Sequence, residues 1–247
     1  MRSTSRVGAL LALVPLFHLP LAQAGLDDYV RTPIVEQGEK EIDLKFGAGR
    51  YPTGGSGTAT SLGFGYGVNS WWFTEVYGKW KRPVGEAGGL DAIEWENKFQ
   101  LTETGRYPVD VGLLLEIERP RDRSEGYELV YGPLLQTEFG RVQANLNVLF
   151  EKHVRSSTPK DTELKYQWQL KYRAHPSFEW GAQGFGELGR WDRWEASSQQ
   201  QHRLGPAIFG KVRTAGNTAI KYNAALLVGT NDQSPRTNLR LQVEYEF

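Results

Sequence analysis

The sequence predicts an all-β fold, a single transmembrane antiparallel up-and-down β-barrel of about twelve strands. Apolar and polar residues alternate strictly, in segments of about ten residues, from Gly38 to Phe247. The 247-residue chain contains 28 glycines and 12% aromatic residues, yet its mean hydropathy is polar. A membrane barrel accounts for this combination because only the lipid-facing half of each strand is apolar. Short and long connections also alternate along the chain.

The first 24 residues have the features of a secretory signal peptide. Arg2 and Arg6 precede an apolar run from Val7 to Leu21, and Ala22-Gln23-Ala24 fits the small-x-small cleavage rule. The run is too short, and too interrupted by proline, for a membrane anchor. We therefore expect cleavage near Ala24 and a barrel formed by residues 38–247.

The parity of the apolar residues places the strands. The last strand is the clearest, because apolar side chains from Leu239 to Phe247 alternate with polar or charged ones. Twelve runs have a lipid-facing apolar parity of this kind: 42–48, 62–68, 72–80, 93–101, 109–117, 127–139, 142–150, 164–172, 180–188, 204–212, 220–228 and 239–247.

The connections between these runs alternate in length, as tight turns and longer loops alternate in outer-membrane barrels. Short connections are expected at 69–70, 140–141, 174–177 and 215–217, with a less tight one at 102–108. Longer ones are expected at 49–57, 82–89, 120–126, 155–161, 192–200 and 231–236. An even strand number with both chain ends on the periplasmic side follows.

The final strand carries a family resemblance. It ends on Phe247, and Tyr245 precedes this residue on the same face. Residues 238–247 thus resemble the C-terminal assembly signal of Gram-negative outer-membrane β-barrel proteins. The resemblance implies an outer-membrane location, recognition by the barrel-assembly machinery during biogenesis, and contact with outer-membrane lipid and lipopolysaccharide. It indicates a small porin-like barrel without a more specific family.

Residues 25–37 show no alternation before the first strand. They include Asp27, Asp28 and Pro33. Short polar termini are usually poorly ordered, so a periplasmic tail is the favoured interpretation. A segment folded into the lumen is the alternative. Gly63, Gly65 and Gly67 alternate along the second strand and predict an inner wall without side chains, which leaves space for a plug or a solute.

The polar parity of each strand should face the lumen, and it is rich in charge. Acidic candidates lie on the fourth to sixth predicted strands and basic candidates on the eighth, tenth and eleventh: Glu94, Glu96, Asp110, Glu116, Glu128 and Glu138, then Lys165, Lys171, Arg173, Arg203, Lys211, Arg213 and Lys221. Two opposed arcs resemble the transverse field of general porins, which orients dipolar solutes and ions. The alternative is that these charges pair, also with Glu179 and Glu187, and fill the interior.

Composition excludes several function classes. Without Arg2 and Arg6 the chain has 27 basic and 29 acidic residues, which is no basic field for nucleic acid. The absence of cysteine excludes disulfides, thiolate metal sites and cysteine nucleophiles. No cofactor motif and no metal-ligand spacing such as H-E-x-x-H occurs. We expect no cofactor.

Catalytic and cation-binding candidates are few. His175-Pro176-Ser177 has the His-x-Ser spacing of outer-membrane lipid A deacylases, but Phe178 follows where that family has Asn, and a turn is the simpler interpretation. His153 with Glu151, and His202 with Arg203, have no serine at nucleophilic spacing. Three carboxylates, those of Glu116, Glu118 and Asp122, could hold Ca²⁺, but such groups are more often solvated.

The sequence thus favours an outer-membrane channel for small hydrophilic or charged solutes over an enzyme. The solute itself is unknown from the sequence. A lipid-modifying hydrolase and an occluded structural or accessory barrel are the alternatives. We expect a monomer, because trimeric porins usually have more strands.

Overall fold

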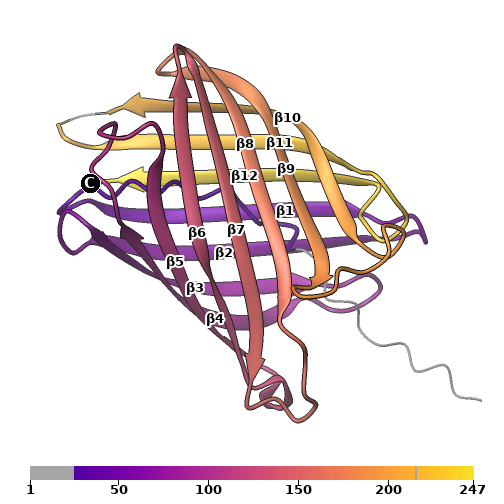
Figure 1. Ribbon diagram of the computed structural model, residues 1–247. Helices are drawn as coiled ribbons and strands as arrows, with labels where there is room; N and C mark the ends of the chain where they lie inside the picture. Colours follow the sequence, from indigo (N-terminus) through magenta and orange to yellow (C-terminus); the bar gives the residue numbers. More distant parts are fainter. Residues whose placement is uncertain (1–24, 215) are drawn as a thin grey trace, which may run out of the picture.

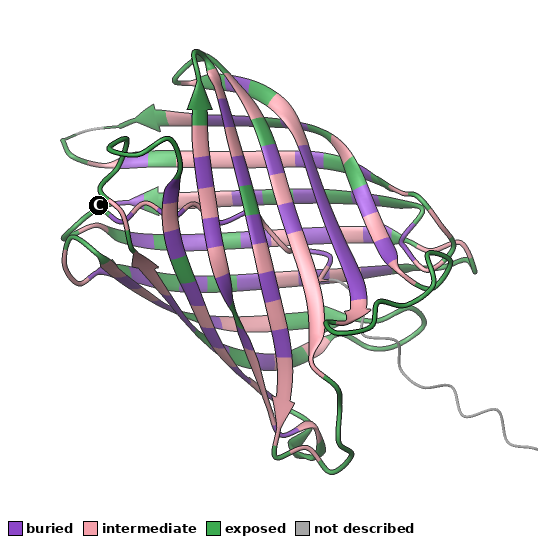
Figure 2. Cartoon of the chain, viewed as in Figure 1, coloured by how far each residue is buried: buried purple, intermediate pink, exposed green. Residues whose placement is uncertain are grey.

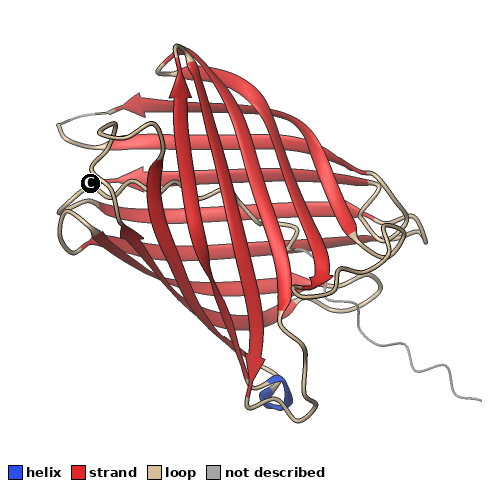
Figure 3. Cartoon of the chain, viewed as in Figure 1, coloured by secondary structure: helices blue, strands red, loops and turns tan. Residues whose placement is uncertain are grey.

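The computed structural model describes residues 25–214 and 216–247 and confirms a closed barrel of twelve antiparallel strands (Figure 1). The strands are β1 Lys40–Arg50, β2 Ser56–Gly67, β3 Trp72–Arg82, β4 Gly89–Gln100, β5 Asp110–Pro120, β6 Tyr127–Phe139, β7 Val142–Val154, β8 Glu163–His175, β9 Phe178–Arg190, β10 Gln201–Arg213, β11 Ala219–Gly229 and β12 Thr237–Glu246. A single 3₁₀ turn, η1 (Arg123–Glu125), interrupts the described β-structure (Figure 3). The predicted signal peptide lies outside the described residues.

The barrel closes between its first and last strands. β1 pairs with β12 in a continuous register that runs from Glu41 opposite Glu246 to Arg50 opposite Thr237. The backbone N–H of Phe247 also donates to the carbonyl of Lys40, at 2.9 Å. A closed sheet pairs every strand edge, which is what a backbone in hydrocarbon requires.

The two faces of the sheet follow the predicted parity. Buried and exposed residues alternate along the strands (Figure 2), and outward side chains such as Leu44, Phe64, Ile93 and Leu239 are exposed and apolar. A barrel in lipid requires this outer surface, whereas a soluble protein rarely exposes so large an apolar area. Among the described residues, no helix has the length and apolar character needed to cross a membrane.

The connections divide the barrel into a turn end and a loop end. The turn end carries the connections between β2 and β3, β4 and β5, β6 and β7, β8 and β9, and β10 and β11. The loop end carries the remaining connections between consecutive strands. As predicted, the shortest connections, 140–141 and 176–177, lie at the turn end.

Residues 25–36, here called the lumen segment, lie inside the barrel rather than in a tail beside it (Figure 1). Leu26 lies near the loop end, close to Gly49 and Gly57, and Glu36 lies near the turn end, close to Gly67. The prediction that these residues form a periplasmic tail is therefore wrong. The polar composition of these residues suits a polar lumen as well as it suits water. Composition alone therefore could not distinguish a segment inside the lumen from a periplasmic tail.

The lumen segment is held by apolar packing and by hydrogen bonds. Val30 is 6% exposed and packs in one cluster with inward side chains of β9, β10 and β11, which are Phe185, Ala207, Phe209, Ala225 and Leu227. Ser61 Oγ donates to Asp27 Oδ2 at 2.6 Å, and the backbone N–H of Val35 donates to Gln100 Oε1 at 2.8 Å. Apolar contacts and satisfied polar groups thus fix the segment.

Glycines in β1 and β2 make room for the segment. A Cβ added at Gly47 would overlap the backbone of Leu26, and one at Gly67 would overlap the carbonyl of Glu36. Gly63 and Gly65 instead accommodate Tyr77 and Phe73 of β3. The side-chain-free inner wall expected from the alternating glycines is thus present, and both the segment and neighbouring aromatic rings fill it.

Candidate functional site

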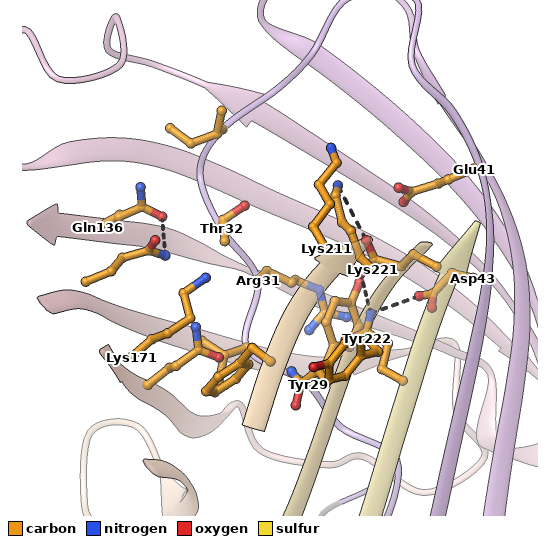
Figure 4. A pocket seen from close by; sticks show the side chains of 18 of the residues that line it. Tyr29, Arg31, Thr32, Glu41, Asp43, Gln136, Lys171, Lys211, Lys221 and Tyr222 are labelled. Carbon is orange, nitrogen blue, oxygen red and sulfur yellow. Dashed lines mark hydrogen bonds and ion pairs between the residues drawn. The ribbon is translucent and has the colours of Figure 1, made fainter. Parts of the chain in front are cut away.

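A cavity of about 480 Å³ lies in the turn-end half of the lumen, between the lumen segment and the barrel wall (Figure 4). Its lining is dominated by charged and amide side chains, because the inward parity of nearly every strand is polar there. Tyr29 and Arg31 of the lumen segment form part of the lining. We call this space the lumen cavity.

Acidic and basic side chains both line the lumen cavity. Carboxylates come from Glu41 and Asp43 of β1, Glu75 of β3 and Glu244 of β12. Ammonium and guanidinium groups come mainly from β8, β10 and β11, of which β11 is the direct neighbour of β12: Lys171, Arg173, Lys211 and Lys221. Acidic lining residues outnumber basic ones.

In the lumen as a whole, however, charges are largely paired with neighbours rather than separated into two arcs. Lys165 of β8 contacts Glu151 of β7 and lies 3.2 Å from Glu187 of β9. Lys171 lies 3.1 Å from Glu179 on β9. Pairing with Glu179 and Glu187, the alternative considered from the sequence, is therefore present, and a barrel-wide transverse field is not supported.

Two cations neutralise the acidic wall of β4 and β5. Lys79 Nζ lies 2.7 Å from Glu94 and 2.6 Å from Glu118. Arg31 of the lumen segment lies 3.0 Å from Glu96 through both Nε and Nη2, and it also contacts Glu116. Because all these carboxylates are buried, each requires such a partner. The alternation of residues in the sequence did not predict that Lys79 or Arg31 would pair with these carboxylates.

The turn-end mouth has its own ion-pair network. Lys221 Nζ lies 3.1 Å from Glu39 and 3.5 Å from Glu244 and also contacts Glu246, which lies 2.6 Å from Lys211 Nζ. A second cavity of about 480 Å³ opens beside this network, between the start of β1 and the connection from β10 to β11. Phe247 lies in its lining.

The candidate lumen residues thus fall into three places. Six line the lumen cavity: Glu96, Glu138, Lys171, Arg173, Lys211 and Lys221. Arg213 lines the second cavity. The remaining six line neither cavity and lie elsewhere on the inward parity: Glu94, Asp110, Glu116, Glu128, Lys165 and Arg203.

Two of the candidate lumen residues, Asp110 and Arg203, form hydrogen bonds that give them a structural role. Asp110 Oδ1 accepts from the backbone N–H of Gly105 at 2.7 Å and thereby holds the β4–β5 connection. Arg203 is 2% exposed and donates to the Gly25 carbonyl at 3.1 Å and to Asn238 Oδ1 at 2.9 Å. Arg203 therefore fixes the start of the lumen segment.

Sequence reasoning missed several residues that contact the segment or fill the lumen. Asn238 Nδ2 donates to the Leu26 carbonyl at 3.2 Å, and Arg240 donates to Gln183 Oε1 at 2.5 Å. Tyr77 donates to Asp43 Oδ2 at 2.7 Å. All lie on the inward parity of their strands, so parity was the available signal. Attention to charge passed over the amides and the phenol, and the search for basic residues on β8, β10 and β11 passed over Arg240 of β12.

The catalytic candidate His175-Pro176-Ser177 forms a turn. His175 Nδ1 lies 2.7 Å from Ser177 Oγ and also accepts from the Ser177 backbone N–H at 3.2 Å. His175 is exposed and Ser177 is half-buried where β8 connects to β9. This contact stabilises the turn as expected of a side chain that accepts from the backbone two residues on.

The three carboxylates considered for Ca²⁺ are separately engaged. Glu116 contacts Arg31, and Glu118 contacts Lys79. Asp122 caps η1, where its carboxylate accepts from the Ser124 backbone N–H at 2.8 Å. Hydrogen bonds from the Ser124 side chain and backbone lower the pKa of Asp122 below its ordinary value.

Comparison with solved structures supports the fold. The crystal structure of an outer membrane channel from Pseudomonas putida matches with a TM-score of 0.58 at 10% identity and covers 86% of this chain and 96% of that chain. The outer membrane protein opdK from Pseudomonas aeruginosa matches with a TM-score of 0.37 at 9% identity, covering 87% of this chain and 99% of that one. The first similarity shows a shared barrel fold. No protein-family model matches the sequence, and no curated protein matches it.

Proposed function

We propose that the protein is an outer-membrane channel for small hydrophilic or charged solutes. The observation that supports this most is the polar, charged lumen cavity of about 480 Å³ inside a closed barrel with an apolar exterior. A space of this size accommodates a small solute, and its side chains offer both donors and acceptors. The channel name of the similar Pseudomonas putida structure is consistent with the proposal.

The acidic excess of the lumen cavity supports selection among solutes. Carboxylates of β1, β3 and β12 line the cavity beside basic groups, as where Lys221 of β11 lies 3.5 Å from Glu244 of β12. The excess of acidic groups favours cations over anions of similar size.

Location and assembly belong to the same proposal. After cleavage of the signal peptide near Ala24, the chain would enter the outer membrane of a Gram-negative cell, with the loop end outward. Tyr245 and Phe247 would serve as the signal for the barrel-assembly machinery. Their rings stack outside β12, with centroids 5.7 Å apart, where such a partner could reach them before closure against β1. The barrel would work as a monomer.

Planar-bilayer recording tests the channel function. The purified full-length barrel should produce discrete, small current steps, because the lumen segment leaves a narrow path beside it. A barrel that inserts, as shown by its resistance to protease in the bilayer, yet never conducts would refute the proposal. That result would instead favour the second candidate, an occluded structural or accessory barrel, for which occupation of the lumen by residues 25–36 is the supporting observation.

A further inference from the structure

Three side chains with metal-binding groups meet inside the loop end of the barrel. Glu128 of β6 lies directly opposite His153 of β7 in the antiparallel register. Glu151 lies two residues before His153, so the alternation of a strand places both on the inner face. A directly opposed residue and a same-face neighbour are the closest side-chain pairs that a β-sheet provides.

The separations within this cluster suit a shared cation. His153 Nε2 lies 3.4 Å from Glu151 Oε1 and 3.7 Å from Glu128 Oε2, and the three ligand atoms all lie within 4.8 Å of one another. These distances exceed those of good hydrogen bonds. Ligands bound tetrahedrally to Zn²⁺ at their usual bond lengths are about 3.4 Å apart, close to what the cluster shows.

The cluster is largely buried, which distinguishes it from a group of carboxylates on the surface. The side chains of His153 and Glu151 are 9% and 5% exposed. His153 Nδ1 is fully buried and has no hydrogen-bond partner among the described residues. An ordered water can satisfy Nδ1. The other ring nitrogen, Nε2, faces the two carboxylates and is the atom available to a cation.

The charges around the cluster leave a place for a cation. Lys165 contacts Glu151 through the other carboxylate oxygen, Oε2, so that Oε1 remains directed at His153. Glu128 has no lysine or arginine ion pair among the described residues, and its ionic contact is with His153. Lys160 Nζ approaches His153 Nε2 to 3.5 Å from an exposed loop and can move away.

Two other clusters of three acidic groups differ in this respect. Glu39 and Glu246 already contact Lys221, and Glu96 and Glu116 already contact Arg31. Neither contains an imidazole. They are ordinary ion-pair networks of the lumen and give no reason to expect a metal.

We propose that Glu128, Glu151 and His153 bind one divalent transition-metal cation of the Zn²⁺ type. An imidazole with two carboxylates suits such a cation, whereas Ca²⁺ and Mg²⁺ prefer oxygen ligands alone. Three protein ligands leave a fourth position open for water or for a group of a passing solute. The site stands independently of channel function, because it requires only the folded barrel.

Isothermal titration of the intact, detergent-purified barrel with ZnCl₂ tests the site. We expect one equivalent of Zn²⁺ to bind, and His153→Ala to weaken this binding by at least about 100-fold, since loss of a direct ligand exceeds the effect of losing an outer partner. Glu128→Gln should weaken it as well. Excess Ca²⁺ should not displace the bound Zn²⁺. Co²⁺ bound in its place should give the visible absorption of a four-coordinate site, which a merely structural role of His153 does not produce.

Matched variants separate this site from adventitious binding. His202→Ala removes an outward histidine near the same end of the barrel, and His175→Ala removes an exposed histidine at the turn end; both should leave the affinity unchanged. Equal Zn²⁺ binding by wild type and His153→Ala, or displacement by Ca²⁺, would overturn the proposal. Should His153→Ala fail to fold, Glu128→Gln provides the same comparison.

Discussion

Deletion of residues 27–36 is expected to raise the single-channel conductance several-fold. These residues fill the lumen from the loop end to the turn end, and their removal leaves the wall intact because each strand is paired only with other strands. Keeping Gly25 and Leu26 preserves the predicted cleavage region. Conductance in planar bilayers and the swelling rate of proteoliposomes in small polar solutes both measure the effect.

Shortening of the exposed loop 83–88 is the matched control for this deletion. That loop lies outside the lumen between β3 and β4, so its loss should change the conductance little. Equal conductance of the wild type and the barrel without residues 27–36 would show that the segment does not limit passage. The wall glycines Gly47 and Gly67 would then have no role in seating a barrier.

Replacement of Arg31 by Met is expected to release the lumen segment. The change leaves Glu96 and Glu116 buried without their cation, and removal of one member of a buried ion pair costs about 3–5 kcal/mol. This cost falls on docking of the segment, because the wall can remain closed when the segment leaves. A loss of about 3 kcal/mol shifts the docking equilibrium by more than about 100-fold.

Labelling of a single cysteine measures this release. The chain contains no cysteine, so Val30→Cys creates one reactive site, buried while the segment is docked. Maleimide should react much faster when Arg31→Met is present, whereas Arg31→Lys, which keeps the charge, should have a smaller effect. Neutralising both carboxylates with Glu96→Gln and Glu116→Gln should restore slow labelling. Unchanged labelling in Arg31→Met would contradict the role assigned to Arg31.

The fold could be predicted from the sequence because one physical rule operates along the whole chain. A strand between lipid and a polar lumen must alternate, so residues such as Leu44, Val111 and Leu241 reveal their faces without any tertiary information. Connection lengths gave the topology in the same way. Neighbouring strands in a barrel are also consecutive in sequence, so no long-range pairing had to be guessed beyond closure.

The interior could be predicted only in part, because parity says that a side chain points inward but not what it meets. The partners of Glu96 and Glu116 come from Arg31, which no strand pattern includes. The segment itself has no periodicity, and its docking depends on glycines and on an apolar cluster that forms only when β9, β10 and β11 stand together. Ion pairing within the ring then replaced the two opposed arcs expected from strand order.

The cluster of Glu128, Glu151 and His153 could likewise be predicted from the sequence only in part. The Glu-x-His pattern of β7 is visible in the sequence and places two side chains on one face. The third member depends on the register between β6 and β7, which sets Glu128 opposite His153. Register is fixed by the length of the tight turn at residues 140–141, which sequence inspection located but did not resolve to a residue pair.

Ion selectivity of the barrel with its lumen segment in place tests the central claim, that solutes cross through the lumen cavity. Lys98 lines the cavity, so Lys98→Glu adds to an acidic excess, while Lys152→Glu changes charge on the outward parity of β7. Under a KCl gradient, Lys98→Glu should shift the reversal potential further toward cation selectivity, and Lys152→Glu should not. Identical reversal potentials for the two variants and the parent barrel would contradict passage through this cavity.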